Sequence, residues 1–299
     1  MRVLTNLLFK VTLSSMIVSA PAMISNKDAK SGSSSEKDIL LPSYSSTIIK
    51  KFVNHTSITA APLYLEEKSV NPVNTYSVNT SSINANSAEA MAKAVETKMV
   101  VSEAVILYDY MSLKRSGLNE KAFEYAWRGY HNLLKKGLIR KKSVLSIVDF
   151  SQSSCSKRMY VIDVRHKKLL YRTFVAHGQN SGAEYADSFS NEPDSYKSSL
   201  GFYITKKTYY GRNGLSLRID GVDSGYNDLA GKRNIVLHGS TYVSVKYMNN
   251  NGAIGTSQGC PALPKTMSPK IIRIVKNGSC LFIYHPTQKY LQESSVING

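Results

Sequence analysis

Hydrophobic and polar residues follow three successive patterns along the chain. Residues 23–97 are rich in Ser, Asn, Thr and Lys and place few large apolar side chains at any regular spacing. Over residues 98–142 apolar side chains recur every three or four positions, and over 143–286 short apolar runs alternate with turn residues. The pattern predicts a flexible low-complexity linker, a helical hairpin and a mainly β domain, in that order. Residues 287–299 are expected to form a frayed C-terminal tail.

The second helix of the predicted hairpin has clear start and stop signals. Asn119 can cap its first turn, and Gly137 stands where a glycine commonly ends a helix. The apolar residues between them recur at helical spacing: Phe123, Ala126, Trp127, Tyr130, Leu133 and Leu134. The first helix is predicted within SEAVILYDYMSLKRSG, which ends at Gly117.

Seven short apolar runs predict the strands of the β domain. They are VLSIVDF, RMYVIDV, KLLYRTFVAHG, LGFYITKK, LSLRID, NIVLHGS and SCLFIYH. Turn residues separate them at spacings typical of a mostly antiparallel sheet. The run PKIIRIVKNG predicts one short helix before the last strand.

The charge of the chain indicates an anionic partner. The formal net charge is +17 at pH 7 and the sequence pI is about 9.6. Nucleic acid, an acidic cell-wall polymer and a membrane surface all fit such a charge. The sequence has no zinc-finger spacing, ribonucleoprotein motif or helix-turn-helix pattern, so specific nucleic-acid binding is the weaker interpretation.

The N-terminus has the features of a secretory signal. Arg2 and Lys10 precede an apolar run from Val11 to Ala20, and Ala20-Pro21-Ala22 resembles a cleavage site. We therefore expect residues 1–22 to be a signal peptide and the protein to act outside the cytoplasm, in the periplasm or cell envelope. An amphipathic anchor that stays attached is the alternative. The apolar run is shorter than the roughly 20 residues that a membrane span needs.

One of the three cysteines has a candidate catalytic partner. Cys260 lies in Ser257-Gln258-Gly259-Cys260, and it follows His238 by 22 residues (260 − 238). A thiol needs a base to become a nucleophile near neutral pH, and a histidine is suited to that task. Gly259 permits a tight turn whose N–H groups converge on an oxyanion. On spacing alone, a structural thiol and a structural histidine remain the alternative. Whether Cys155 and Cys280 form a disulfide also stays open.

Several blocks together resemble one known family. IVLHGS followed by SQGC is similar to the signature of the L,D-transpeptidase (YkuD-type) catalytic domain. The wider run resembles its murein L,D-transpeptidase branch in VAHGQNSG, SFSNEPDSYKSSLGFY, TYYGRNGLSLRIDG, GYNDLAGKRNIVLHGSTYV and GAIGTSQGCPALP. The resemblance covers about residues 143–285. It implies a mainly β, β-sandwich-like catalytic domain that needs no metal or organic cofactor.

The resemblance also implies roles for individual residues. Cys260 matches the nucleophile that forms a thioester with a peptidoglycan stem peptide, and His238 matches its base. Gly239 matches the position whose carbonyl orients the imidazole, and the N–H groups of Gln258, Gly259 and Cys260 match the oxyanion-binding turn. The family reaction transfers the acyl group to another stem and gives a 3→3 cross-link.

Other candidate residues are less distinctive. Ser257, Tyr210, Arg218 and Arg233 are candidates for substrate binding, the arginines because they can hold a stem carboxylate. A solvated surface position fits each arginine equally well. His177 is more simply a hydrogen-bonded histidine in a turn. Many family members have histidine where this chain has Gln258, and Arg or Asn where Pro261-Ala262 follow the cysteine. The acceptor of the acyl group is therefore left open.

Three functions follow from these observations. The first is an exported cysteine transpeptidase acting on peptidoglycan stem peptides, with anionic wall polymers as neighbours. Capture of the same thioester by water gives the alternative of an L,D-carboxypeptidase. A non-catalytic wall-binding protein is a further alternative, although it has no need of the His238/Cys260 pair. The oligomeric state cannot be deduced from the sequence.

Overall fold

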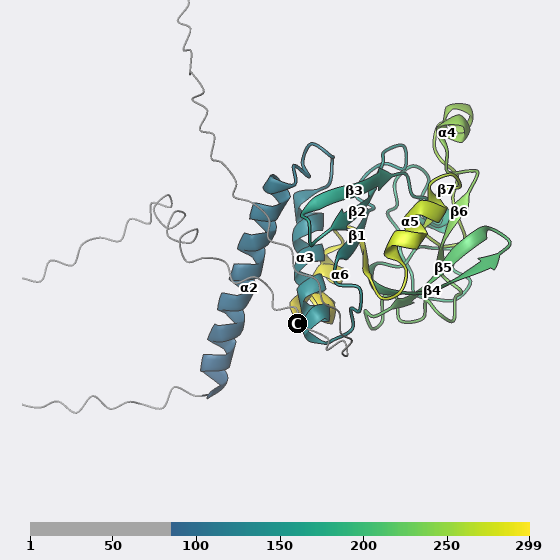
Figure 1. Ribbon diagram of the computed structural model, residues 1–299. Coiled ribbons are helices and arrows are strands. Elements are labelled where there is room, and N and C mark those ends of the chain that lie inside the picture. Colours follow the sequence, from purple (N-terminus) through teal and green to yellow (C-terminus); the bar gives the residue numbers. More distant parts are fainter. Residues whose placement is uncertain (1–84) are drawn as a thin grey trace, which may run out of the picture. The chain divides into compact units, whose positions relative to one another are not determined.

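An eight-stranded sheet forms the centre of the described chain (Figure 1). The structure is a computed structural model that describes residues 85–299. The predicted signal segment and most of the predicted linker lie outside these residues. The strand order is β3-β2-β1-β8-β4-β5-β6-β7, in which β1–β8 and β6–β7 are parallel pairs and all other neighbours are antiparallel. The prediction of a mainly β domain behind N-terminal helices is confirmed.

Seven of the eight strands coincide with the apolar runs of the sequence. They are β1 (Val144–Asp149), β2 (Met159–Asp163), β3 (Lys168–Thr173), β4 (Gly201–Gly211), β5 (Gly214–Gly221), β6 (Val236–Ser240) and β8 (Cys280–Tyr284). The eighth, β7 (Ala262–Pro264), directly follows Cys260 and is too short to show an alternating pattern. It exists because it pairs with β6.

Helices cover both faces of the central strands. Helix α3 (Glu120–Lys135) packs on β1 and β8, and α5 (Ser268–Val275) contacts β1 together with β5 and β6. Because α5 contacts both halves of the sheet, the sheet bends around it. Strands β1 and β8 are buried along their whole length, which explains why they are apolar runs without alternation.

The helical hairpin begins earlier in the chain than predicted. Helix α2 (Ala85–Tyr110) extends into the segment assigned to the linker, and α3 begins and ends where the sequence signals placed it. Asn119 caps α3 by accepting from the N–H groups of Lys121 and Ala122. The first part of α2 is rich in alanine, which favours a helix, but it has no regularly spaced large apolar residues. The periodicity therefore did not reveal it.

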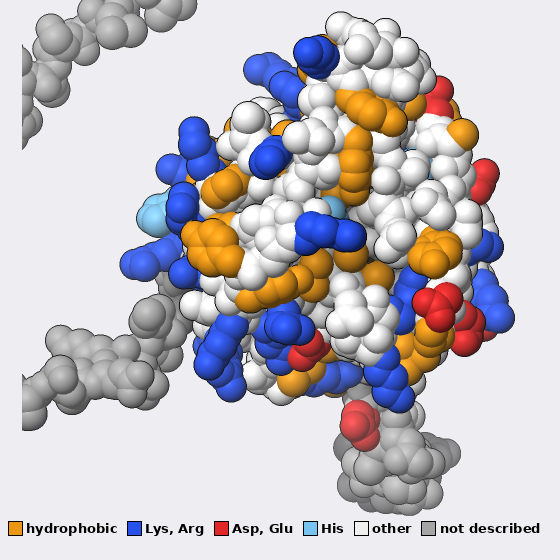
Figure 2. Space-filling model, turned by 90° about the vertical axis from the view of Figure 1, so that its right-hand side faces the viewer, with side chains coloured by type: hydrophobic (Ala, Val, Ile, Leu, Met, Phe, Trp, Pro, Cys, Tyr) orange, Lys and Arg blue, Asp and Glu red, His pale blue; other side chains and the backbone are white. Residues whose placement is uncertain are grey.

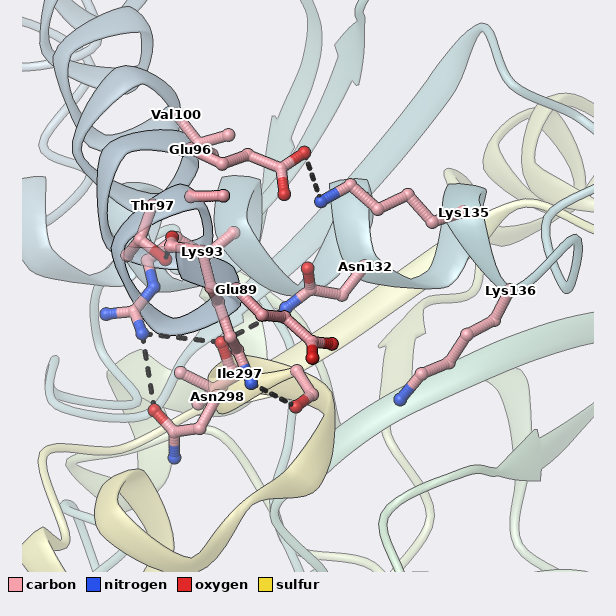
Figure 3. A pocket seen from close by; sticks show the side chains of 13 residues that line it. Glu89, Lys93, Glu96, Thr97, Val100, Asn132, Lys135, Lys136, Ile297 and Asn298 are labelled. Atoms are coloured by element: carbon pink, nitrogen blue, oxygen red, sulfur yellow. Dashed lines mark hydrogen bonds and ion pairs between the residues drawn. The ribbon is translucent and has the colours of Figure 1, made fainter. Parts of the chain in front are cut away.

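A cavity of about 600 Å³ lies between α2, α3 and the C-terminal residues (Figure 3). Lys135 on α3 reaches across to Glu96 on α2, with 2.5 Å between nitrogen and oxygen. Lys93 on α2 donates to the carbonyl of Gly299 over 2.9 Å. None of the predicted site residues lines this cavity.

The C-terminal residues differ from the predicted frayed tail. They form α6 (Gln288–Glu293) and α7 (Ser295–Asn298), which bury Tyr290, Leu291, Val296 and Ile297. The buried Asp223 holds both helices, because it accepts hydrogen bonds from the Tyr290 hydroxyl at 3.2 Å and the Ser294 hydroxyl at 2.5 Å. These contacts join residues far apart in the sequence, so a local sequence pattern could not predict them.

Two further short helices had no counterpart in the sequence prediction. The 3-10 helix η1 (Gln179–Ser181) follows His177, and α4 (Val245–Asn251) lies between β6 and Cys260. Ser244 caps α4, and Gly252 ends it in a left-handed conformation. Within residues 85–299, no helix is both long and apolar enough to cross a membrane.

The contact between α3 and the sheet provides a stability test. A Cβ atom added at Gly129 of α3 would lie 2.1 Å from Cζ of Phe202 on β4. We expect Gly129→Ala to destabilise the protein by about 1–3 kcal/mol, because the overpacked ring has to move. Gly231→Ala is the matched control, since its added Cβ meets nothing within 4 Å, and it should change stability by less than about 0.5 kcal/mol. Urea unfolding measures both, and equal effects would contradict this account of the packing.

Candidate active site

Strand β6 holds His238 with one ring nitrogen already engaged. The Nδ1 atom lies 3.1 Å from the carbonyl oxygen of Gly239, which can only accept. Nδ1 therefore carries the proton, and Nε2 has its lone pair available as a base. The next residue faces the opposite side of the strand, where a Cβ on Gly239 would lie 2.2 Å from Oγ of Ser268. Close packing of α5 thus requires glycine beside this histidine.

The thiol of Cys260 lies against the backbone of the same strand. The N–H of Val236 donates to Sγ at 3.4 Å, and Sγ lies 3.7 Å from the carbonyl oxygen of Asn234. In the parallel pairing of β6 with β7, His238 is opposite Ala262. Val236 and His238 are two residues apart on one strand, so their side chains share a face. The fold therefore places the half-buried Cys260 beside the strand that carries His238, two residues before the partner of His238.

Ser257 organises the turn that leads to the cysteine. Its hydroxyl donates to the carbonyl oxygen of Cys260 at 2.6 Å and accepts from the N–H of Gly259 at 3.1 Å. Gly259 has a φ of +107°, and an added Cβ would lie 2.7 Å from the carbonyl oxygen of Lys197. Only glycine fits this backbone and this contact. Ser257 is thus a support of the turn in this structure.

The same contacts determine which N–H groups remain for an oxyanion. The N–H of Gly259 is used within the turn. Among the described residues, the N–H groups of Gln258 and Cys260 donate to no protein acceptor. These two are therefore the available donors of the three that the family resemblance suggested. Two donors on one turn are a suitable arrangement for a developing negative charge.

Burial keeps both reactive groups neutral near pH 7. It raises the pKa of the Cys260 thiol, which the Val236 N–H and the nearby Arg233 partly counteract. It lowers the pKa of His238, against the opposing effect of the bond to Gly239. A neutral thiol beside a neutral imidazole is suited to proton transfer during attack, as opposed to a resting ion pair.

Arg233 is committed to holding a neighbouring loop. Its guanidinium donates to the carbonyl oxygens of Ser190 at 2.8 Å and Lys197 at 2.7 Å. It also donates to the hydroxyls of Ser195 and Ser199. These bonds fasten the segment 190–199 beside Gly259 and Cys260, so the position predicted for substrate binding shapes the border of the site.

Arg218 and Tyr210 lie on opposite faces of the hairpin formed by β4 and β5. Arg218 is exposed and in register with Val236, so it shares the face of His238. Tyr210 is paired with Leu215 on the other face and is 80% exposed. The tyrosine that accompanies Arg218 is instead Tyr209, whose ring centroid lies 4.9 Å from the guanidinium carbon. The prediction named Tyr210, because the sequence YY does not show which ring shares the face of Arg218; only the strand register decides this.

The other two cysteines lie on other segments of the fold. All three thiols of residues 85–299 are free. Cys280 is fully buried in β8, whereas Cys155 lies in a loop and its Sγ contacts the carbonyl oxygen of Gly252 at 3.3 Å. The described part of the chain contains no group of three or more His, Cys, Asp or Glu that could hold a metal ion.

Basic side chains are spread over the face that carries α4 and strands β4–β7. Figure 2 shows this face with Lys and Arg both along its outline and near its middle, and with Asp and Glu mainly toward one edge. The distribution agrees with the net charge of +17 for the whole chain.

Comparison with solved structures gives low similarities. An L,D-transpeptidase from Mycobacterium smegmatis aligns at 11% identity with a TM-score of 0.30, covering 48% of this chain and 59% of that one. One from Stackebrandtia nassauensis aligns at 16% identity with a TM-score of 0.28, covering 55% and 67%. L,D-transpeptidase 3 from Mycobacterium tuberculosis aligns at 11% identity with a TM-score of 0.31, covering 48% and 61%.

The chain thus spans about 59% of the first of these proteins, and TM-scores of this size carry no argument about function. No curated protein matches the chain. The family model of the L,D-transpeptidase catalytic domain, in contrast, matches residues 114–284, which is more than half of the chain. The protein therefore belongs to the L,D-transpeptidase catalytic domain family.

Proposed function

We propose that the protein is a cysteine L,D-transpeptidase that joins peptidoglycan stem peptides through a thioester on Cys260. The observation that carries the proposal is the bond between Nδ1 of His238 and the Gly239 carbonyl oxygen, because it leaves Nε2 free to act as a base, on the strand whose backbone contacts the thiol. Family membership supports the class of reaction. The cysteine mechanism and the 3→3 cross-link are parts of this proposal.

The first half of the reaction forms the thioester. His238 Nε2 takes the thiol proton while Sγ attacks the donor carbonyl carbon, and the N–H groups of Gln258 and Cys260 stabilise the resulting oxyanion. Collapse breaks the carbon–nitrogen bond to the terminal D-alanine. The imidazolium returns the proton to the leaving amine, so charge and protons balance.

The second half passes the acyl group to an acceptor. The side-chain amine of another stem attacks the thioester carbonyl carbon, and His238 accepts a proton from it. The carbon–sulfur bond then breaks, and the thiolate regains the proton from the imidazolium. Water attacking in place of the amine gives hydrolysis and makes the enzyme an L,D-carboxypeptidase.

We further propose that Arg218 holds a carboxylate of the stem peptide. Arg218 lies on the same face as His238 and is exposed, and its guanidinium stacks near the ring of Tyr209. A planar guanidinium pairs well with a carboxylate. Arg233 is less suited, because four acceptors already occupy it.

The place of action is proposed as the bacterial periplasm or cell envelope, where the substrate is. The signal-like features of residues 1–22 support this, and the positive net charge suits a wall with anionic polymers. Mass spectrometry of the N-terminus of the protein from an envelope fraction tests it. An intact N-terminus on cytoplasmic protein would contradict it.

Product analysis tests the reaction. Incubation of the purified protein with a tetrapeptide muropeptide should release D-alanine and give cross-linked dimers. Cys260→Ala should reduce turnover by at least about 1,000-fold, because the covalent step is lost. Cys155→Ala is the matched control and should keep wild-type turnover. Tripeptide without dimers would identify a carboxypeptidase, and full turnover by Cys260→Ala would contradict the nucleophile.

The pH dependence tests the resting protonation state. Because burial lowers the pKa of His238, the imidazole should stay a base below the ordinary histidine value of about 6.5. Acylation should therefore persist at pH 6 and decline only on further acidification. Because burial raises the pKa of Cys260, alkylation of its thiol by iodoacetamide should increase only above about pH 8.5. An alkylation midpoint below pH 7 would show a thiolate–imidazolium pair and contradict this account.

Kinetics of Arg218 variants test the carboxylate anchor. Arg218→Ala should raise KM by about tenfold with a smaller change in kcat, because a charge-assisted contact to bound substrate is lost. Arg212→Ala removes an exposed arginine at the tip of the same hairpin and should change neither value more than about twofold. Equal effects of the two variants would indicate general electrostatic attraction instead of a specific anchor.

A further inference from the structure

Arg158 is a buried cation that forms no salt bridge within the described chain. Its side chain is 0% exposed, and no carboxylate of residues 85–299 lies within 4.0 Å of its nitrogens. It donates to the carbonyl oxygens of Val175, at 3.1 Å from both Nε and Nη2, and of Gln152, at 2.8 Å. The ring of Phe150 lies 4.8 Å from its guanidinium carbon. Burying a charge is costly unless hydrogen bonds compensate, so these contacts are what stabilises the cation at this position.

What Arg158 holds is one tautomer of His177. Nη2 of Arg158 lies 2.7 Å from Nδ1 of His177, and a guanidinium has no acceptor. Nδ1 must therefore accept, and the proton sits on Nε2, which donates to the carbonyl oxygen of Gly182 at 3.0 Å. The imidazole is 1% exposed, and burial together with the neighbouring guanidinium lowers its pKa to about 4. His177 is thus a neutral side chain with both nitrogens in use.

The backbone of His177 in turn holds the cysteine turn. Its carbonyl oxygen accepts from the N–H of Ser257 at 2.9 Å, and the Ser257 hydroxyl oxygen lies 3.3 Å away. On either side, Ala176 pairs with Ala262 and Gly178 with Ser257. The Ser257 hydroxyl then bonds to Gly259 and Cys260.

We propose that Arg158 and His177 are a positioning pair for the nucleophile, acting through Ser257 on the turn that carries Cys260 and the oxyanion donors. The pair touches neither the substrate nor the reacting atoms. It holds the segment 176–178 at the place where the 257–260 turn is built. The inference rests on the proposed function, because it assigns the pair to the chemistry of Cys260.

Gln and Asn at position 177 differ in which ring nitrogen of the histidine they replace. His177→Gln removes the acceptor at the Nδ1 position, so Arg158 loses its partner. His177→Asn places an amide oxygen close to the position of Nδ1 and should keep that partner. His131→Asn, in α3 and remote from the turn, is the control for loss of a largely buried histidine.

Two reagents separate positioning from unfolding. A carbapenem, as a slow acylating probe, needs the oxyanion donors of the turn, whereas iodoacetamide needs only an accessible thiol. Cys280 is fully buried and reports general opening when it becomes alkylated. Peptide mass spectrometry measures all three thiols, and hydrogen exchange measures the amides of residues 254–263.

The expected result is selective. His177→Gln should slow carbapenem acylation of Cys260 by about 10- to 100-fold, as a small displacement of a catalytic group does. Its iodoacetamide alkylation should stay within about threefold of wild type, with Cys280 protected, and His177→Asn should recover most of the acylation rate. His131→Asn should acylate like wild type.

Three results would overturn the pairing: acylation of His177→Gln at the wild-type rate, equal losses in the Asn and Gln variants, or a loss that only follows alkylation of Cys280. Absence of acylation in the wild type would instead count against the proposed function. Hydrogen exchange then decides the positioning by itself. His177→Gln must speed exchange at residues 254–263, and unchanged exchange there would refute it.

Discussion

The reactive part of the molecule depends on one short pairing of backbone, between residues 176–178 and the two ends of the cysteine turn. Ala176 donates to the carbonyl oxygen of Ala262 at 2.8 Å, and Gln179 donates to that of Ser257 at 2.7 Å. Without these bonds the residues around Cys260 would form a free glycine-rich loop. With them, the turn is closed on one side by 176–178 and on the other by β6. This constraint holds a thiol and two N–H donors beside the strand that carries His238.

Close packing limits which residue types fit at two positions, one on β6 and one in the cysteine turn. Glycine is required at position 239 because Ser268 of α5 packs directly on β6 there. It is required at position 259 because the carbonyl oxygen of Lys197 packs against the turn. Arg233 holds the loop that supplies Lys197. Glycine is therefore required at the two positions for different causes. At Gly239 a helix approaches too closely for a Cβ atom, whereas Gly259 combines a positive φ with a backbone neighbour.

The sequence predicted the larger elements well because each has a strong local signal. Asn119 and Gly137 marked the ends of α3, and the apolar runs marked seven strands. Elements with few residues or no periodicity were missed or misjudged: β7, α4 and the C-terminal helices. The last two helices are stabilised by Asp223, whose distance along the chain from Tyr290 and Ser294 hides the contact from any local pattern. In the site, the motif identified His238 and Cys260 as candidates, whereas Tyr209 and the Arg158–His177 pair were not recognised.

The sequence by itself determined which residue types were available: histidines at strand ends, His238 among them, a cysteine in a glycine turn, and a strongly basic chain. Only the tertiary structure decided their partners. In the folded chain, Nε2 is the free nitrogen of His238 and the N–H of Gly259 is bonded within the turn. Tyr210 lies on the face opposite Arg218, and Arg233 is bonded to the loop 190–199. The physical reason is that hydrogen bonds and packing contacts join segments far apart in sequence, and a side chain's chemistry depends on which neighbour has already taken its donors and acceptors.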